Sequence, residues 1–191
     1  YKPRSPYSAS KASGDHLTKA WFNTYGVPII ISNCSNNYGP YHFPEKLIPL
    51  TITNIIRNKS IKIYGDGKNI RDWLFVNDHC SALDKILMHG KAGSNYCIGG
   101  DNEITNIELV NNICEIMDFK KIPKKNSSKD LITFIRDRPG HDLRYSINST
   151  KLKNEFNWKP EVKLKDGLEE TIKWYLDNKN WWQPLIKNYE N

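Results

Sequence analysis

The sequence has 191 residues, of which 38% are hydrophobic and 26% charged, so its length suggests one domain or one and a part. This composition excludes an intrinsically disordered chain, and no run of about 18 apolar residues suggests a membrane span. The net charge of +7 permits nucleic-acid binding, but the lysines cluster only in residues 120–130, without interleaved aromatic residues, which favours a solvated loop.

The first residues of the chain indicate whether the sequence is a fragment, and the cysteines indicate the redox state of its cellular compartment. Tyr1 takes the place of an initiator Met, and the opening "YKPRSPY" lacks the apolar core of a signal peptide, so we expect a fragment of a longer protein. Cys34, Cys80, Cys97 and Cys114 are widely spread, with no CxxC pair and no histidine at zinc-finger spacing. We therefore expect no disulfide framework, no metal site and a reduced, cytoplasmic protein.

The first predicted elements are a helix and a strand. Ser5 can cap a helix with Pro6 at its first position, and apolar spacing continues the helix to about Tyr25, where Gly26 ends it. Residues 28–34, "PIIISNC" with its β-branched run, predict a strand of the kind that is buried on both faces of a parallel sheet.

The rest of the chain alternates between helical and extended patterns. Helices are predicted over residues 46–58, 78–89, 106–117, 149–158 and 164–179. Strands are predicted over residues 61–67, 71–76, 94–100 and 131–135. This alternation, without an internal repeat, predicts an α/β fold.

Tyr7 and Lys11 stand one helical turn apart among small residues in "SPYSASKASGDH", residues 5–16. Residues four apart share a helix face, so both can serve one site. A free tyrosine, with a pKa near 10, is a poor base at neutral pH, but a nearby ammonium favours the phenolate, which can accept a hydroxyl proton. Taken alone, however, YxxxK also occurs by chance on exposed helices.

Longer stretches carry a resemblance that covers nearly the whole chain. They are residues 5–16, "NCSNNYGPYHFPEKLIP" (33–49), "IYGDGKNIRDWLFVNDHCSAL" (63–83), "YCIGGDNEITNIELV" (96–110) and "DRPGHDLRYSINSTKL" (137–152). In order and spacing they resemble the dTDP-glucose 4,6-dehydratase family of the extended short-chain dehydrogenase/reductase superfamily.

The resemblance implies an α/β fold made of the C-terminal part of a Rossmann-type NAD-binding domain and a smaller mixed α/β substrate-binding domain. Residues 1–45 would form the tail of the NAD-binding domain with the YxxxK helix. Residues 46–191 would form mainly the sugar-nucleotide-binding domain, with a segment at about 71–90 returning to the NAD-binding domain.

The resemblance also implies roles for individual residues. Tyr7 would be the active-site base and Lys11 its partner on the NAD ribose, while Asn37 would contact the nicotinamide end. Expected hexose and diphosphate contacts are Asn36, Glu45, Lys46 and Leu47; expected nucleoside contacts are Lys62, Ile63 and Tyr64; expected diphosphate and nucleotide contacts are Arg71, Asn106, Arg138 and His141.

The reaction of the family has three steps: oxidation of the C4 hydroxyl by NAD, loss of water across C5 and C6, and return of the hydride to C6. The elimination uses an Asp-Glu pair upstream of the tyrosine, which this sequence does not contain. It also contains no GxxGxxG turn, and "IGGDNE" (98–103) lacks the third glycine of such a turn. We therefore expect the 191-residue chain alone to be inactive.

Simpler interpretations compete at several positions. Arg71 and Asp72 are compatible with a surface ion pair, Asn106 with a helix cap, and Tyr64 with an ordinary sheet aromatic. His141 in "RPGHD" is more often a loop hydrogen-bonding residue than a catalytic one. Residues 77–79, "NDH", start a helix more plausibly than they bind a metal.

Other functions remain open as well. UDP-hexose 4-epimerases and UDP-glucuronate decarboxylases share YxxxK, although residues 36–49 and 137–142 look more like the dehydratase pattern. A non-enzymatic nucleotide- or RNA-binding module is an alternative of another class. By analogy with the family we expect a homodimer through the YxxxK helix, whose outer face offers Leu17, Trp21 and Tyr25. We expect no nucleic-acid and no membrane partner.

Overall fold

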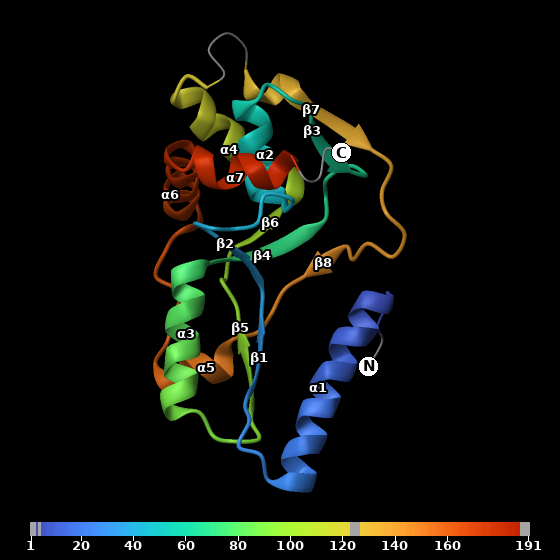
Figure 1. Cartoon of the computed structure of the whole chain (residues 1–191), viewed down its shortest axis with the longest axis vertical. Coiled ribbons are helices and arrows are strands. Elements are labelled where there is room, and N and C mark those ends of the chain that lie inside the picture. The colour runs from blue at the N-terminus through green and yellow to red at the C-terminus, as the bar shows by residue number, and fades with distance from the viewer. Residues whose placement is uncertain (1–2, 4, 123–126, 188–191) are drawn as a thin grey trace.

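The computed structural model describes residue 3, residues 5–122 and residues 127–187, and it is elongated, with two parts along its long axis (Figure 1). One part holds a short parallel sheet flanked by helices, and the other holds most of the remaining strands and helices. No helix in the described part of the chain is long and apolar enough to cross a membrane.

The smaller part is built on two parallel strands. β1 (Ile31–Cys34) pairs with β5 (Asn95–Ile98), and α3 (Val76–His89) and α5 (Thr150–Phe156) cover one side (Figure 1). Its buried core consists of Leu74, Ala82, Ile86, Tyr96, Ile98, Leu152 and Trp158. The parallel pairing of residues 31–34 is confirmed. Burial on both faces is wrong, because Ile31 is buried on one face of β1 while Ser32 on the other face is exposed.

The helix α1 (Pro6–Tyr25) begins and ends where the sequence predicts. The Ser5 hydroxyl accepts a hydrogen bond from the Ser8 backbone N–H at 3.1 Å, and Gly26 ends the helix with a left-handed φ of 66°. None of its residues is buried. One side-chain tie to β1 is the hydrogen bond from Asn33 Nδ2 to Asp15 Oδ2 at 3.1 Å. The helix therefore keeps its outer face open.

The larger part contains a four-stranded mixed sheet. β4 (Ile70–Phe75) lies between β2 (Asn36–Tyr38), which is parallel to it, and β6 (Glu103–Thr105), which is antiparallel, and it also pairs with β8 (Arg144–Tyr145). β3 (Ile61–Tyr64) and β7 (Ile132–Ile135) form a separate parallel pair.

Four helices and a 3-10 turn complete the larger part. They are α2 (Leu47–Ile56), α4 (Asn106–Phe119), η1 (Ser128–Leu131), α6 (Leu164–Asp177) and α7 (Lys179–Lys187). Their apolar faces enclose a core whose buried members include Ile48, Ile52, Trp73, Phe75, Leu109, Ile113, Leu168, Ile172 and Trp182.

The strand β4 joins the two cores. Leu74 packs in the core of the smaller part, whereas its neighbours Trp73 and Phe75 pack in the core of the larger part. Successive residues of a strand point to opposite faces, so one strand can supply both cores. The two parts are thus connected by shared packing rather than by the chain alone.

The loop predicted over residues 120–130 is only partly within the described residues, because residues 123–126 lie outside them. Ser127 and Ser128 both bind the carboxylate of Asp118, and Lys129 forms an ion pair with Glu115 at 2.9 Å. The C-terminal side of this segment is therefore a bonded turn with Ser128 buried rather than a wholly solvated loop.

Candidate active site

Tyr7 and Lys11 lie in the first two turns of α1, at the end of the helix that points toward β8 (Figure 1). The helix is continuous, so the two side chains share one face. Tyr7 is 73% exposed, and Lys11 is exposed as well. Their neighbours are serines, alanines and a glycine, which leaves room for a ligand to approach the phenol.

Tyr145 on β8 is a residue of this region that the sequence did not single out. Its hydroxyl donates a hydrogen bond to the Cys34 backbone carbonyl at 3.1 Å, at the carboxyl end of β1. Burial, together with smaller effects of ionisable groups that include Cys34 and Tyr7, raises the pKa of Tyr145. Tyr145 therefore ties β8 to the end of β1, within electrostatic range of Tyr7.

Asn37 presents an unused acceptor just beyond β1. Its Nδ2 donates to the Ser35 carbonyl at 3.1 Å and to Cys34 Sγ at 3.2 Å, while its Oδ1 is buried without a partner. The hydroxyl of Ser35 is also buried without a partner. Buried polar atoms are rarely left unpaired, so this pair suits a ligand with both donors and acceptors, such as a carboxamide. Asn36 lies beside them on β2, paired with Trp73 of β4.

Tyr64 lies beside Arg138 and His141, which come much later in the sequence. The Arg138 guanidinium lies 5.7 Å from the centroid of the Tyr64 ring, and the His141 ring lies edge-on to Tyr64 at 6.3 Å. His141 Nδ1 is 2.7 Å from Asp137 Oδ1, which confirms its hydrogen-bonding role in the loop. Hydrogen bonding from His141 lowers the pKa of Asp137. An aromatic face and a guanidinium fork side by side suit a base and a phosphate.

Arg71 is not a surface residue. It is 9% exposed, and its guanidinium donates to the carbonyls of Ile70 at 2.7 Å and Asp142 at 2.8 Å. Its neighbour Asp72 is buried and accepts from the backbone N–H groups of residues 100 and 102. The alternative of a surface ion pair between Arg71 and Asp72 is therefore wrong. Burial, and then the charge of Arg138, lower the pKa of Arg71.

Asn106 is not the cap of the helix that follows. Thr105 caps α4 in a capping box with Glu108, in which the Glu108 N–H donates to the Thr105 hydroxyl and Glu108 Oε2 accepts from the Thr105 N–H. Asn106 is the first helical residue, and its Oδ1 is buried without a partner. The capping interpretation of Asn106 is therefore wrong, and its amide oxygen is available to a ligand.

The side chains of the three predicted nucleoside contacts on β3 point to opposite faces of the strand. Lys62 and Tyr64 are exposed on one face of the strand, whereas Ile63 is 2% exposed and packs in the larger core. Alternation along a strand explains the difference. Ile63 can therefore contribute only backbone atoms to a ligand site, while Lys62 and Tyr64 can contribute side chains.

Residues 39–46, which we call the sugar loop, carry two of the predicted hexose and diphosphate contacts. Glu45 and Lys46 form an ion pair at 2.7 Å, with both side chains partly exposed, and Leu47 begins α2 and packs against the larger core. Burial, and then the charge of Lys46, lower the pKa of His42 to about 4, so its imidazole is neutral at physiological pH.

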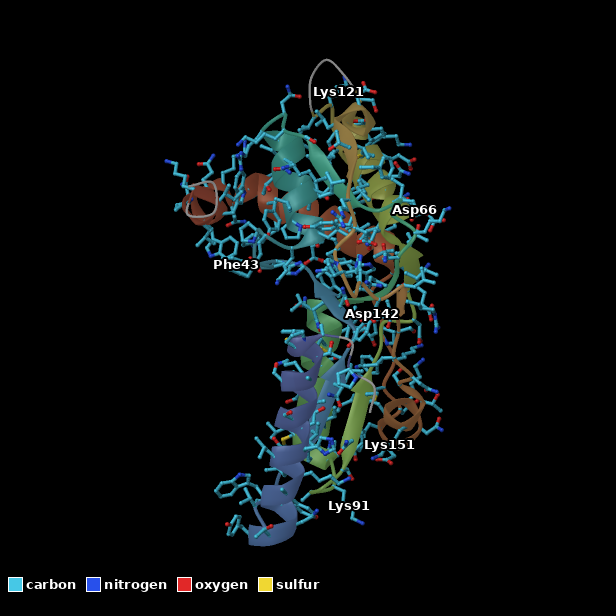
Figure 2. All side chains as sticks on the ribbon, turned by 90° about the vertical axis from the view of Figure 1, so that its right-hand side faces the viewer. Phe43, Asp66, Lys91, Lys121, Asp142 and Lys151 are labelled. Atoms are coloured by element: carbon cyan, nitrogen blue, oxygen red, sulfur yellow. The ribbon has the colours of Figure 1, made fainter. Side chains whose placement is uncertain are left out.

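The structure thus gathers the predicted residues into groups rather than into one pocket. Tyr64, Arg71, Arg138 and His141 lie around the loop that ends in Asp142. The N-terminal end of α1, which carries Tyr7 and Lys11, lies on the other side of β8 in Figure 1. Figure 2 places Asp142 and Phe43 at the level where the two parts of the molecule meet. The segment 137–145 therefore connects Tyr64 and Arg71 with the end of β1.

All four cysteines are unpaired. Within residues 3, 5–122 and 127–187, no group of three or more His, Cys, Asp or Glu side chains is placed to hold a metal ion.

The parallel strand pairs flanked by helices are consistent with part of a Rossmann-type α/β fold. A family model described as GDP-mannose 4,6 dehydratase matches residues 1–171, and the chain belongs to this family. A probable dTDP-glucose 4,6-dehydratase of Sinorhizobium fredii is 55% identical over 97% of this chain and 53% of its own length. The chain spans about half the length of the curated relatives it matches.

Solved structures agree with the fold. The crystal structure of dTDP-glucose 4,6-dehydratase from Bacillus anthracis in complex with NAD is 49% identical, with a TM-score of 0.88 over 96% of this chain and 56% of that chain. The dTDP-glucose 4,6-dehydratase of Streptomyces venezuelae, with NAD and TYD bound, is 42% identical, with a TM-score of 0.90 over 96% of this chain and 55% of that chain. The predicted fold class and family resemblance are confirmed.

Proposed function

We propose that this chain forms the catalytic-helix and sugar-nucleotide-binding part of a dTDP-glucose 4,6-dehydratase, which converts dTDP-glucose to dTDP-4-keto-6-deoxy-glucose. The observation that carries the proposal is the group of Tyr64, Arg71, Arg138 and His141 around the loop that ends in Asp142, in a chain whose helix α1 presents Tyr7 and Lys11 on one face. The relatives named above, at 42% to 55% identity, support the choice of reaction.

In the proposed oxidation step, the Tyr7 phenolate accepts the proton of the C4 hydroxyl. Its exposed position on α1 allows a sugar to reach it, and the Lys11 ammonium on the same face stabilises the negative charge. The buried acceptor on Asn37 suits the carboxamide of a nicotinamide, and Lys11 suits the hydroxyls of its ribose. NAD, when bound, supplies the oxidation and reduction at carbon.

The rest of the proposed site binds the nucleotide. The exposed ring of Tyr64 can stack on a base, Arg138 offers a planar fork to phosphate oxygens, and Asn106 offers its buried amide oxygen. Glu45 and Lys46 of the sugar loop would contact the hexose and diphosphate. In domain terms, we assign residues 1–45 and about 71–90 to the NAD-binding domain and most of 46–191 to the sugar-nucleotide domain.

The proposal includes a homodimer through α1. Leu17, Trp21 and Tyr25 recur every four residues and are each more than half exposed, and the rings of Trp21 and Tyr25 contact each other at 4.8 Å. An exposed apolar stripe of this kind suits packing against the same helix of a second copy. Light scattering on the chain should give twice the monomer mass, and a clean monomer would count against the dimer.

The unpaired cysteines favour a reducing, cytoplasmic setting.

Competition among nucleotides tests the substrate class. We expect the 191-residue chain to bind dTDP more tightly than UDP or GDP in calorimetric titrations, because the proposed nucleotide contacts lie within it. Preference for UDP would favour the epimerases or decarboxylases, and preference for GDP would favour the substrate in the name of the family model. Salt-sensitive binding of an arbitrary oligonucleotide, without nucleotide preference, would favour a nucleic-acid-binding module instead.

A further inference from the structure

The sugar loop is held from outside by the two C-terminal helices. The ring of Tyr41 contacts the ring of Trp174 on α6 at 4.7 Å and that of Trp181 on α7 at 5.4 Å, and these two tryptophans contact each other at 5.1 Å. In Figure 1 the segment between β2 and α2 passes beside α7. We call Tyr41, Trp174 and Trp181 the aromatic brace.

The backbone at Tyr41 is in an uncommon conformation. Its φ of 60° lies in the left-handed region, which a bulky aromatic residue seldom adopts. Such a conformation persists only where surrounding contacts determine it, and it tends to occur at functional sites. Tyr41 is 67% exposed, and its described ring contacts are those with the two tryptophans, so we assign the support of this conformation to them.

A second contact holds the next residue. The Tyr175 hydroxyl donates a hydrogen bond to the His42 backbone carbonyl, and Tyr175 itself is fully buried in the larger core. Within the loop, the His42 N–H donates to the Gly39 carbonyl and the Lys46 N–H to the Phe43 carbonyl. The loop is therefore fixed to α6 at two successive residues, three residues before Glu45.

We propose that the aromatic brace positions the sugar loop, so that the C-terminal helices set the affinity for the hexose and diphosphate half of the sugar nucleotide. This inference rests on the proposed function. Glu45 and Lys46 lie three and four residues after His42, where the loop joins α2 through the Leu50 N–H to Lys46 carbonyl hydrogen bond. Their side chains pair with each other and are partly exposed. The thymidine half would bind at Tyr64, Arg71 and Arg138, which the brace does not contact.

Because the brace contacts the loop proposed for the hexose and diphosphate but not the residues proposed for the thymidine, an experiment can distinguish positioning of this loop from a general effect on stability. In the Tyr41→Ala variant we expect hydrogen exchange at the amides of residues 42–46 to rise, and the Kd for dTDP-glucose to rise about threefold to tenfold, from the loss of aromatic contacts. The Kd for dTMP should stay within about twofold, because dTMP lacks the hexose and the second phosphate. Tyr41→Phe keeps the ring and should behave as the unaltered chain.

Phe119→Ala is the matched control, since it removes another exposed aromatic ring, at the end of α4, outside the sugar loop. Unchanged loop exchange or unchanged dTDP-glucose affinity in Tyr41→Ala would overturn the inference. An equal loss of affinity for dTMP and dTDP-glucose would also overturn it, because it would indicate general destabilisation. If the unaltered chain binds neither ligand, the proposed function fails, while the exchange measurement still decides whether the ring holds the loop.

Discussion

Replacing Tyr7 with phenylalanine lowers the turnover of dTDP-glucose by about 10²-fold to 10⁴-fold, the range of general acid–base catalysis by a positioned side chain. The ring remains, so packing is preserved, but the phenylalanine has no oxygen to accept the C4 proton. Tyr7 is largely exposed and none of the α1 residues is buried, so the loss should not come from unfolding.

The assay uses the chain joined to the N-terminal half of the Bacillus anthracis dehydratase, which supplies the sequence that this chain does not match. The 191-residue chain alone, which we expect to be inactive, is the baseline. Tyr25→Phe is the matched control on the same helix, three turns or more from Lys11, and should keep full activity. Full turnover by Tyr7→Phe, or a loss that follows a drop in dTDP-glucose affinity, would refute the role of base.

Acidification from about pH 6.5 to pH 4 lowers the free energy of unfolding through His42 by up to roughly 3 kcal/mol. Burial, and then the positive charge of Lys46, lower the pKa of His42 from 6.5 to about 4 in the folded chain. Between these two values the unfolded chain binds a proton at His42 that the folded chain does not. Stability therefore falls as the pH falls through this window, and the contribution of His42 levels off below pH 4.

Urea unfolding at a series of pH values measures this loss, with His42→Gln as the comparison. Glutamine cannot titrate, so the variant should lack the part of the slope that His42 causes, while carboxylates contribute to both curves. The Tyr175 hydroxyl binds the backbone carbonyl of residue 42, so this contact survives the substitution. Identical slopes for the two proteins would show that His42 titrates normally.

The sequence predicts the long elements of this fold well. Helix α1 has its cap at Ser5 and its stop at Gly26, as local chemistry requires, and β1 pairs in parallel as its β-branched residues indicate. The helix over residues 46–58 forms in spite of Pro49, because the proline lies in the first turn of α2, where it breaks no hydrogen bond.

The short elements could not be predicted from local pattern. β2, β6 and β8 have three, three and two residues, and each is a strand only because β4 lies beside it. The helix α7 contains Pro184 and starts two residues after α6 ends, so its pattern merges with that of α6.

The sequence indicates which residue types could serve a site, but it does not indicate which of these residues lie together in the fold. Tyr145 escaped notice because its role depends on a hydrogen bond to Cys34, 111 residues earlier. The alternative of a surface pair for Arg71 failed for a related reason, because the Asp142 carbonyl that binds Arg71 becomes its neighbour only in three dimensions. The alternative of a cap at Asn106 failed for a local reason, because Thr105 and Glu108 have the spacing of a capping box.

The position of Leu74 between Trp73 and Phe75 has a mechanical consequence. One extended strand contributes side chains to both hydrophobic interiors, so neither half can swing away from the other without pulling apart a stretch of packed β-structure. Any opening or closing around a substrate must then come from movement of the outer loops and helices, while β4 keeps the two hydrophobic cores in a fixed relative position.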